Sequence, residues 1–176
     1  NGTIVAEKTT GEDGKVVFNN LPPGKYIYCE TVAPSGYVIN KVEGKFEISA
    51  NGQIFKATIE DEKIKGNLEL TKVNVENGNP LAGAKFEILA SDRTTVVASG
   101  VSDTSGKVTI NNLEYGSYYY RETEAPKGFV LDNSLKPFEI RNNGETVKAT
   151  VNNSPSEGGF ELTKTDVVTG KVIPNA

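Results

Sequence analysis

The sequence contains no histidine, no tryptophan and no methionine, and it has a single cysteine. Histidine is the commonest general base and the commonest metal ligand in proteins, so its absence argues against most hydrolytic and metal-dependent sites. One cysteine can form neither an internal disulfide nor a thiolate zinc site. We therefore expect no cofactor, no bound metal and no enzyme that turns over.

The charge balance excludes two further classes of partner. Lys and Arg total 19 against 23 Asp and Glu, which gives a net charge of −4. This mild acidity argues against nucleic-acid binding and against a polybasic membrane anchor. No apolar run approaches the ~20 residues that span a bilayer, so we expect no membrane insertion. Without a start methionine or a signal segment, the chain is expected to be an interior part of a longer protein.

The sequence repeats itself. Shifted by 92 residues (Glu30 onto Glu122, 122 − 30 = 92), it aligns without a gap and gives 34 identities over 84 overlapping positions. Such a match indicates tandem copies of one unit. We predict a unit lacking its first strands over 1–65, a complete unit over 66–157, and the first strand of a third unit over 158–176.

Each copy has the pattern of a β domain. Alternating apolar and polar residues, separated by turn signals that include Asn143-Gly144, predict seven short strands in the complete unit. These strands are expected at residues 68–72, 85–89, 94–98, 107–110, 118–122, 138–140 and 147–153. The pattern predicts an all-β chain made of tandem immunoglobulin-like sandwiches of about 92 residues.

Three polar residues fall on the apolar faces of predicted strands. Strand side chains alternate between two faces, so Lys72 points the same way as Leu68 and Leu70. By the same parity, Glu122 shares a face with two tyrosines, and Asn153 shares one with the apolar residues of the last strand. The equivalent positions 92 residues away are Lys164, Glu30 and Asp61, the last on a predicted strand with Phe55, Ala57 and Ile59.

Buried polar groups of this kind should meet one another, because an unpaired buried charge costs several kcal/mol. Burial also disfavours the charged forms, and a neutral amine is a nucleophile, while a protonated carboxylic acid can polarise an amide carbonyl. Attack of Lys72 on the Asn153 carboxamide would release ammonia, and attack of Lys164 on Asp61 would release water. The alternative is a buried Lys–Glu pair with an Asn hydrogen bond and no covalent chemistry. Asn152 is a neighbouring candidate electrophile, but its parity places it on the outer face.

Several motifs together resemble the collagen-adhesin B-type (Cna-B) repeat of Gram-positive surface adhesins and pilins. They are Leu70-Thr71-Lys72, Leu81-Ala82-Gly83-Ala84-Lys85-Phe86, Gly116-Ser117-Tyr118 and Glu122-Thr123-Glu124-Ala125-Pro126-Lys127-Gly128-Phe129. The resemblance implies an inverse-immunoglobulin, prealbumin-like sandwich with a spontaneous Lys–Asn or Lys–Asp isopeptide bond. On that basis Lys72 is the nucleophile, Asn153 the electrophile and Glu122 the proton shuttle. In the first unit Glu30 and Asp61 match, and the corresponding lysine is Lys164.

The resemblance also implies a role and a location. We expect a structural stalk module of an adhesin or pilin at the cell-wall-anchored, extracellular surface of a Gram-positive bacterium. The alternative is a module that binds an extracellular-matrix ligand of the host. The expected partners are neighbouring repeats of the same protein and, by strand exchange, another copy of the chain. Neither a Leu-Pro-x-Thr-Gly sorting motif nor a Tyr-Pro-Lys-Asn pilin motif is present.

Three other features have simpler interpretations. Cys29 is next to Glu30 and should face outwards as a surface thiol, although a thioester is the alternative. Asp13-Gly14 and residues 103–106 lack the spacing of a calcium loop and indicate turns. Tyr118 and Tyr120 are expected in the core, which leaves little of the tyrosine run for a sugar-binding surface.

Overall fold

The computed structural model describes residues 2–175, and all regular elements in that range are β-strands. The chain divides into two compact units, the first ending at Lys63 and the second beginning at Ile64. The prediction of an all-β chain is therefore confirmed. Within residues 2–175 no helix is long and apolar enough to cross a membrane.

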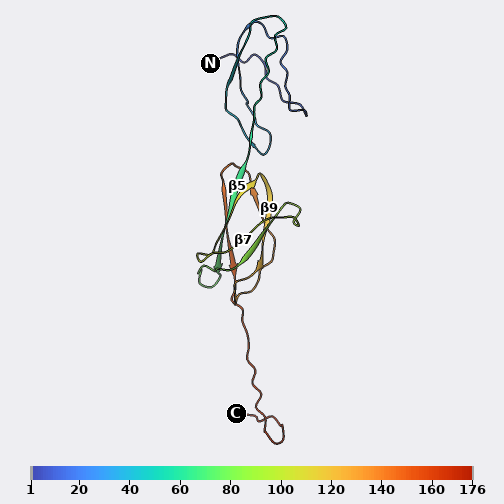
Figure 1. The fold of residues 1–176 in the computed structure, drawn as a ribbon. Helices are drawn as coiled ribbons and strands as arrows, with labels where there is room; N and C mark the ends of the chain where they lie inside the picture. The colour runs from blue at the N-terminus through green and yellow to red at the C-terminus, as the bar shows by residue number, and fades with distance from the viewer. Residues whose placement is uncertain (1, 176) are drawn as a thin grey trace. The chain divides into compact units, whose positions relative to one another are not determined.

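The second unit is a sandwich of two sheets (Figure 1). In the first sheet β5 (Lys65–Asn74) is central, with β11 (Thr146–Asn153) parallel on one side and β8 (Lys107–Glu114) antiparallel on the other. The second sheet has the order β10-β9-β6-β7. Its strands are β6 (Lys85–Leu89), β7 (Val96–Val101), β9 (Gly116–Glu124) and β10 (Lys136–Ile140).

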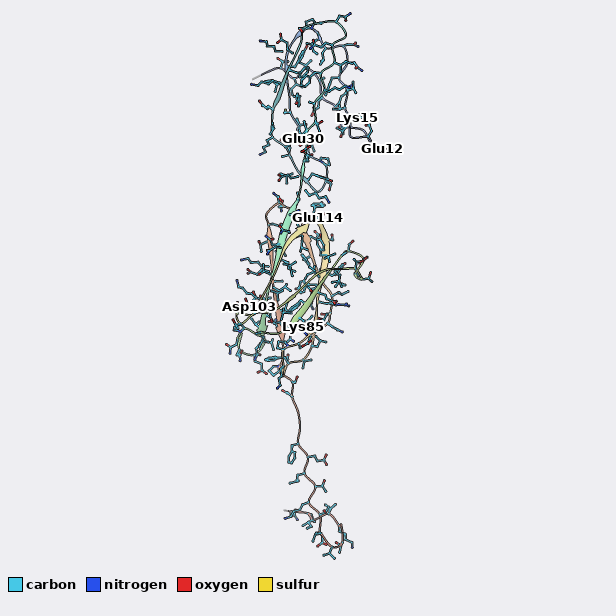
Figure 2. All side chains as sticks on the ribbon, viewed as in Figure 1. Glu12, Lys15, Glu30, Lys85, Asp103 and Glu114 are labelled. Atoms are coloured by element: carbon cyan, nitrogen blue, oxygen red, sulfur yellow. The ribbon has the colours of Figure 1, made fainter. Side chains whose placement is uncertain are left out.

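The core lies between the two sheets and follows the alternation of the sequence. On β5 every second residue from Gly66 to Asn74 is buried, as expected for a strand with one face on the core. Glu114, at the end of β8, and Asp103, just before its start, are labelled in Figure 2 and mark the two ends of this strand. The buried apolar cluster consists of Leu68, Leu70, Ala84, Phe86, Ile88, Val108, Ile110, Leu113, Tyr120, Phe138, Ile140 and Val151.

The seven strands expected in this unit are found, β6 with the expected ends and the others with shifted ends. Only β7 begins later than expected, at Val96 instead of position 94, and it continues to Val101. Asp92 explains the late start, because its Oδ1 accepts hydrogen bonds from the backbone N–H groups of Thr94 (2.9 Å) and Thr95 (2.8 Å). These contacts draw both threonines into the preceding turn, where side-chain capping competes with strand pairing.

The first unit contains two small sheets. Strand β1 (Gly24–Tyr28) pairs antiparallel with β3 (Gly44–Ile48), and β2 (Tyr37–Val38) pairs antiparallel with β4 (Glu62–Lys63). The β1–β3 pair corresponds to β9–β10 of the second unit. In both units these paired strands carry stacked aromatic rings.

The same aromatic contacts occur within each unit, at positions 92 residues apart. The rings of Tyr26 and Phe46 stack with centroids 5.2 Å apart, and those of Tyr118 and Phe138 stack at 5.4 Å. The Tyr26 hydroxyl donates to the carbonyl of Pro22 at 2.6 Å, and the Tyr118 hydroxyl donates to Glu114 at 2.9 Å. The two units therefore share local geometry as well as sequence in this region.

The strand expected around Phe55, Ala57 and Ile59 is not formed, and this expectation was wrong. Residues 54–61 have no strand partner, and Phe55 and Ile59 are 46% and 42% exposed. The equivalent strand in the second unit, β11, pairs with β5. The described part of the first unit has no strand in the place of β5, so residues 54–61 have nothing to pair with.

The third copy also differs from its expected form. Residues 160–164 lie outside any sheet, and Phe160 and Leu162 are 89% and 77% exposed. The equivalent residues of the second unit, Leu68 and Leu70, are fully buried. A strand needs hydrogen-bonding partners on at least one side, and sequence alone does not provide them.

Candidate functional site

The core of the second unit brings together Lys72, Glu122 and Asn153. Lys72 is on β5 and Asn153 on the adjacent parallel strand β11, where Lys72 is opposite Val151 and Asn153 is the next residue on the same face. Glu122 comes from β9 in the opposite sheet. Their exposed fractions are 0% for Lys72, 1% for Glu122 and 2% for Asn153, so all three are shielded from water.

Lys72 and Glu122 form a buried ion pair. The Nζ atom of Lys72 lies 3.2 Å from Oε1 of Glu122. The pair is close but poorly aligned, and neither atom has a hydrogen-bond partner of good geometry among the described residues. The ring of Phe86, whose backbone pairs with Glu122, has its centroid 5.9 Å from Nζ. An aromatic ring therefore faces the amine on a side where water would solvate an exposed lysine.

The second oxygen of Glu122 contacts the asparagine. Nδ2 of Asn153 donates to Oε2 of Glu122 at 2.9 Å and to the carbonyl of Val130 at 2.8 Å. The backbone N–H of Asp132 also donates to Oε2, at 3.2 Å. Oδ1 of Asn153 is buried without a partner among the described residues. The carboxyl thus faces the amide nitrogen, whereas the sequence argument expected it to face the carbonyl oxygen.

Burial makes the lysine a weaker base. Desolvation lowers the pKa of Lys72 below its ordinary value of 10.5, and the nearby charge of Glu122 opposes this only in part. A lower pKa means that the neutral form of the amine, which has a free lone pair, is populated more readily than in a surface lysine. The site therefore combines an amine with nucleophilic character, a carboxyl and a carboxamide.

Backbone contacts hold the lysine in place. The N–H of Lys72 donates to the carbonyl of Gly106 at 2.7 Å, and its own carbonyl accepts from Leu81 at 2.9 Å. Gly106 has φ +75°, and a Cβ there would lie 2.4 Å from the Lys72 carbonyl oxygen. Only glycine permits this close approach, which fixes the end of β5 from which the nucleophile projects.

Asn152 lies on the outer face. It is exposed, whereas Asn153 is buried, as strand alternation predicts.

Sequence reasoning missed two contributors to the site, the carbonyl of Val130 and the N–H of Asp132. Both are backbone groups on the segment after the Ala-Pro turn, and no side-chain pattern could have identified them.

The first unit contains part of the same arrangement. Glu30 accepts a hydrogen bond at Oε2 from the N–H of Asn40 at 2.8 Å, the counterpart of the Asp132 contact (132 − 40 = 92). Asn40 also donates through Nδ2 to the carbonyl of Glu60, the residue before Asp61. Oδ1 of Asp61 is buried and has no partner among the described residues. Lys164 belongs to the other unit and is exposed.

The remaining candidates behave as simple structural features. Cys29 is exposed. Asp103 caps a turn, accepting at Oδ1 from the N–H groups of Ser105 (2.8 Å) and Lys107 (2.9 Å). Tyr120 is buried, and Tyr118 is half-buried against the core. Residues 2–175 contain no cluster of three potential metal-ligating side chains.

Comparison with known proteins identifies the family. A family model described as "SpaA: Prealbumin-like fold domain" matches residues 1–63 and 66–155. The structure is similar to that of the Bacillus anthracis TIE protein, with 38% identity and a TM-score of 0.82 over 92% of this chain and 31% of that one. It is also similar to BcpA, the major pilin subunit of Bacillus cereus, with 29% identity and a TM-score of 0.52 over 71% of this chain and 41% of that one.

A curated relative is the collagen adhesin of Staphylococcus aureus, which is 27% identical over 56% of this chain. The chain spans only 9% of that adhesin and less than half of either similar structure. The matches cover both units, and they agree with the resemblance to Cna-B-type repeats of adhesins and pilins. The chain belongs to the SpaA family of prealbumin-like fold domains.

Proposed function

We propose that this chain is part of the stalk of a Gram-positive surface adhesin or pilin, and that an isopeptide bond between Lys72 and Asn153 locks its second unit. The observation that carries the proposal is the single carboxyl of Glu122, whose two oxygens contact the amine and the amide in the buried core. The pilin and adhesin relatives support the stalk role. The same relatives support an extracellular position associated with the cell wall.

The reaction begins with a proton transfer. Lys72 gives a proton to Oε1 of Glu122, 3.2 Å away, which converts a buried ion pair into a neutral amine and a carboxylic acid. The low-dielectric surroundings favour this exchange, because both charges disappear together. The amine then attacks Cγ of Asn153 and forms a tetrahedral intermediate.

The second step expels ammonia. The attacking nitrogen loses a proton through the Glu122 carboxyl, whose Oε2 lies 2.9 Å from the departing Nδ2. The Cγ–Nδ2 bond breaks, and the nitrogen leaves as ammonia. The Val130 carbonyl, which already accepts from Nδ2, positions it for departure. One C–N bond forms and one breaks, so the step needs neither an oxidant nor a cofactor.

The product would join the first and last strands of the unit. Lys72 and Asn153 are 81 residues apart in sequence (153 − 72 = 81). By analogy with a disulfide closing a loop of that size, the bond should stabilise the fold by about 4 kcal/mol through the unfolded state alone. Thiols do not cleave an amide, and tension along β5 and β11 would pass through a covalent bond. These are useful properties in a stalk that contains one cysteine.

Intact-mass measurement tests the bond directly. The mass of the folded chain should be lower than the sequence mass by one ammonia, and Lys72→Ala should abolish this loss. Lys85→Ala is the matched control, because Lys85 is an exposed lysine with its own ion pair to Glu124. A folded wild-type chain whose mass equals the full sequence mass would overturn the proposal. Tandem mass spectrometry after proteolysis should find the two peptides joined through residues 72 and 153.

A further inference from the structure

The segment that follows β9 runs beside the chain that follows β11. We call residues 126–132 the strap and residues 154–156 the clamp. The two are joined through their backbones, and the clamp begins directly after Asn153. The contacts are hydrogen bonds from the Val130 N–H to the Ser154 carbonyl (2.9 Å) and from the Ser156 N–H to the Gly128 carbonyl (2.8 Å), with an antiparallel bridge between Phe129 and Pro155.

The strap brings two backbone groups to the reacting side chains. The Val130 carbonyl accepts from Nδ2 of Asn153 at 2.8 Å. The N–H of Asp132 donates to Oε2 of Glu122 at 3.2 Å, and this is the oxygen that also contacts Nδ2. Val130 therefore binds the clamp through its N–H and the amide through its carbonyl. Because of these contacts, the position of the strap decides how the departing nitrogen and the carboxyl are oriented.

A turn that contains a glycine sets the direction of the strap. The N–H of Phe129 donates to the carbonyl of Pro126 at 3.1 Å, which closes a four-residue turn. Gly128 is the third residue of this turn and has φ +84°, and a type II turn requires a positive φ at that position. A Cβ on Gly128 would meet no heavy atom within 4 Å. An alanine there would strain the backbone of the strap without contacting a neighbour.

The strap is held more weakly than the strands around the site. Lys72 and Glu122 project from β5 and β9, which pair with neighbouring strands along most of their lengths. The strap lies outside both sheets, and its residues Val130 and Leu131 are 54% and 43% exposed. Segments with few buried apolar contacts open at a lower free energy than core strands. We expect the strap to dock after the two sheets have packed.

We propose that docking of the strap on the clamp completes the reactive site and sets the rate of bond formation. Val130 and Asp132 are positioning residues that act through their backbone groups. The inference rests on the proposed function of the Lys72 site, because it concerns when that reaction starts. Packing of the sheets brings Lys72 beside Glu122, and docking of the strap then orients the Asn153 amide. A misplacement of reacting groups by about 1 Å slows a reaction by up to about a hundredfold.

The test compares two glycines under similar backbone strain. Gly128→Ala strains the strap, whereas Gly144→Ala strains the hairpin before β11, where φ is +76° and a Cβ also meets no heavy atom within 4 Å. The full chain is made by cell-free translation and quenched in denaturant at intervals. Intact mass gives the fraction of chains that has lost ammonia. Protease resistance at the same times gives the fraction that has folded.

The expected difference lies in the reaction and not in folding. Among folded chains, Gly128→Ala should lose ammonia about tenfold to a hundredfold more slowly than wild type, and Gly144→Ala should match wild type. A purely structural role of the strap would change protease resistance alone. Equal rates of ammonia loss in the folded fractions of the two variants would overturn the positioning role.

A second pair of variants acts on the clamp. Ser156→Pro removes the N–H that holds Gly128, whereas Ser156→Ala keeps it. Ser156 is exposed and lies outside both sheets, so this pair decides the question if Gly128→Ala does not fold. Ammonia loss should be slower in Ser156→Pro than in Ser156→Ala. Equal rates in this pair would show that docking on the clamp does not control the reaction.

The outcomes separate this inference from the proposed function. A wild-type chain that folds and never loses ammonia overturns the Lys72–Asn153 bond and, with it, the role of the strap. A wild-type chain that loses ammonia, together with Gly128→Ala and Ser156→Pro variants that lose it equally fast, overturns the role of the strap alone. The bond itself would then stand.

Discussion

Nζ of Lys72 and Oε1 of Glu122 lie 3.2 Å apart, with both side chains fully shielded from solvent. Burying two charges costs several kcal/mol per ion, and good geometry must offset this cost. Here the alignment is poor, since neither atom forms a hydrogen bond within the described residues. Conversion of the amine to an amide removes the lysine charge permanently. The unfavourable pair therefore provides part of the driving force for the reaction we propose.

Removal of the carboxyl should stop the reaction. In Glu122→Gln and Glu122→Ala no group remains between the amine and the amide to move protons, so we expect no ammonia loss by intact mass. Glu124→Gln is the matched control, because Glu124 lies on the same strand but is exposed. Circular dichroism should show a β fold in all three variants. Full loss of ammonia in a folded Glu122→Ala chain would show that another group shuttles the proton.

Loss of the electrophile should weaken the second unit. Asn153→Ala prevents closure of the 81-residue loop (153 − 72 = 81) and leaves Lys72 and Glu122 as a buried, unbonded pair. We expect the free energy of unfolding to fall by about 4 kcal/mol or more, which is about 20 °C in Tm for a domain of this size. Asn152→Ala, on the outer face of the same strand, should change Tm by only a few degrees. Equal Tm values for the two variants in a calorimetric scan would contradict the bond.

Stability without the bond should depend on pH through Lys72. In Asn153→Ala the lysine stays free beside Glu122, with Asp132 also contributing charge, and burial lowers its folded-state pKa. Between that lowered pKa and 10.5 the unfolded chain binds more protons than the folded one, so the free energy of unfolding rises with pH. Below the window, the folded state bears the full cost of the buried charge.

Chemical denaturation at several pH values measures this effect. The reference is the double variant Lys72→Met with Asn153→Ala, in which the tyrosines and surface lysines titrate unchanged. The free energy of unfolding of Asn153→Ala, relative to that of the double variant, should rise with pH through the window. A gap that stays constant would mean that Lys72 has the same pKa in the folded and unfolded chains.

Gly106 should be needed to position the nucleophile. Gly106→Ala combines a positive φ with a Cβ 2.4 Å from the Lys72 carbonyl oxygen, so the end of β5 must shift. We expect slower ammonia loss during refolding and a loss of about 1–3 kcal/mol from backbone strain alone. Gly14→Ala has a similar φ without that contact and should not affect the Lys72–Asn153 bond. Equal rates of ammonia loss in both variants would contradict a positioning role.

The sequence by itself determined which faces the key residues occupy. Strand alternation placed Lys72, Glu122 and Asn153 inward and Asn152 outward, because the two-residue period of a strand leaves no choice once the apolar face is known. It also indicated an all-β sandwich, since turn residues and short alternating runs are local signals. The start of β7 was misplaced because the capping of Thr94 and Thr95 by Asp92 depends on turn geometry.

Only the tertiary structure decided how these residues meet. Alternation cannot show that β5 and β11 are parallel neighbours, or that Glu122 reaches them from the opposite sheet. It cannot orient the Asn153 amide, whose Nδ2 donates to the Val130 carbonyl, or the Glu122 carboxyl, which accepts from the N–H of Asp132. It also predicted a strand at residues 54–61, where none forms. Strands exist through hydrogen bonds to partners distant in sequence, and a local pattern specifies a strand's faces without providing that partner.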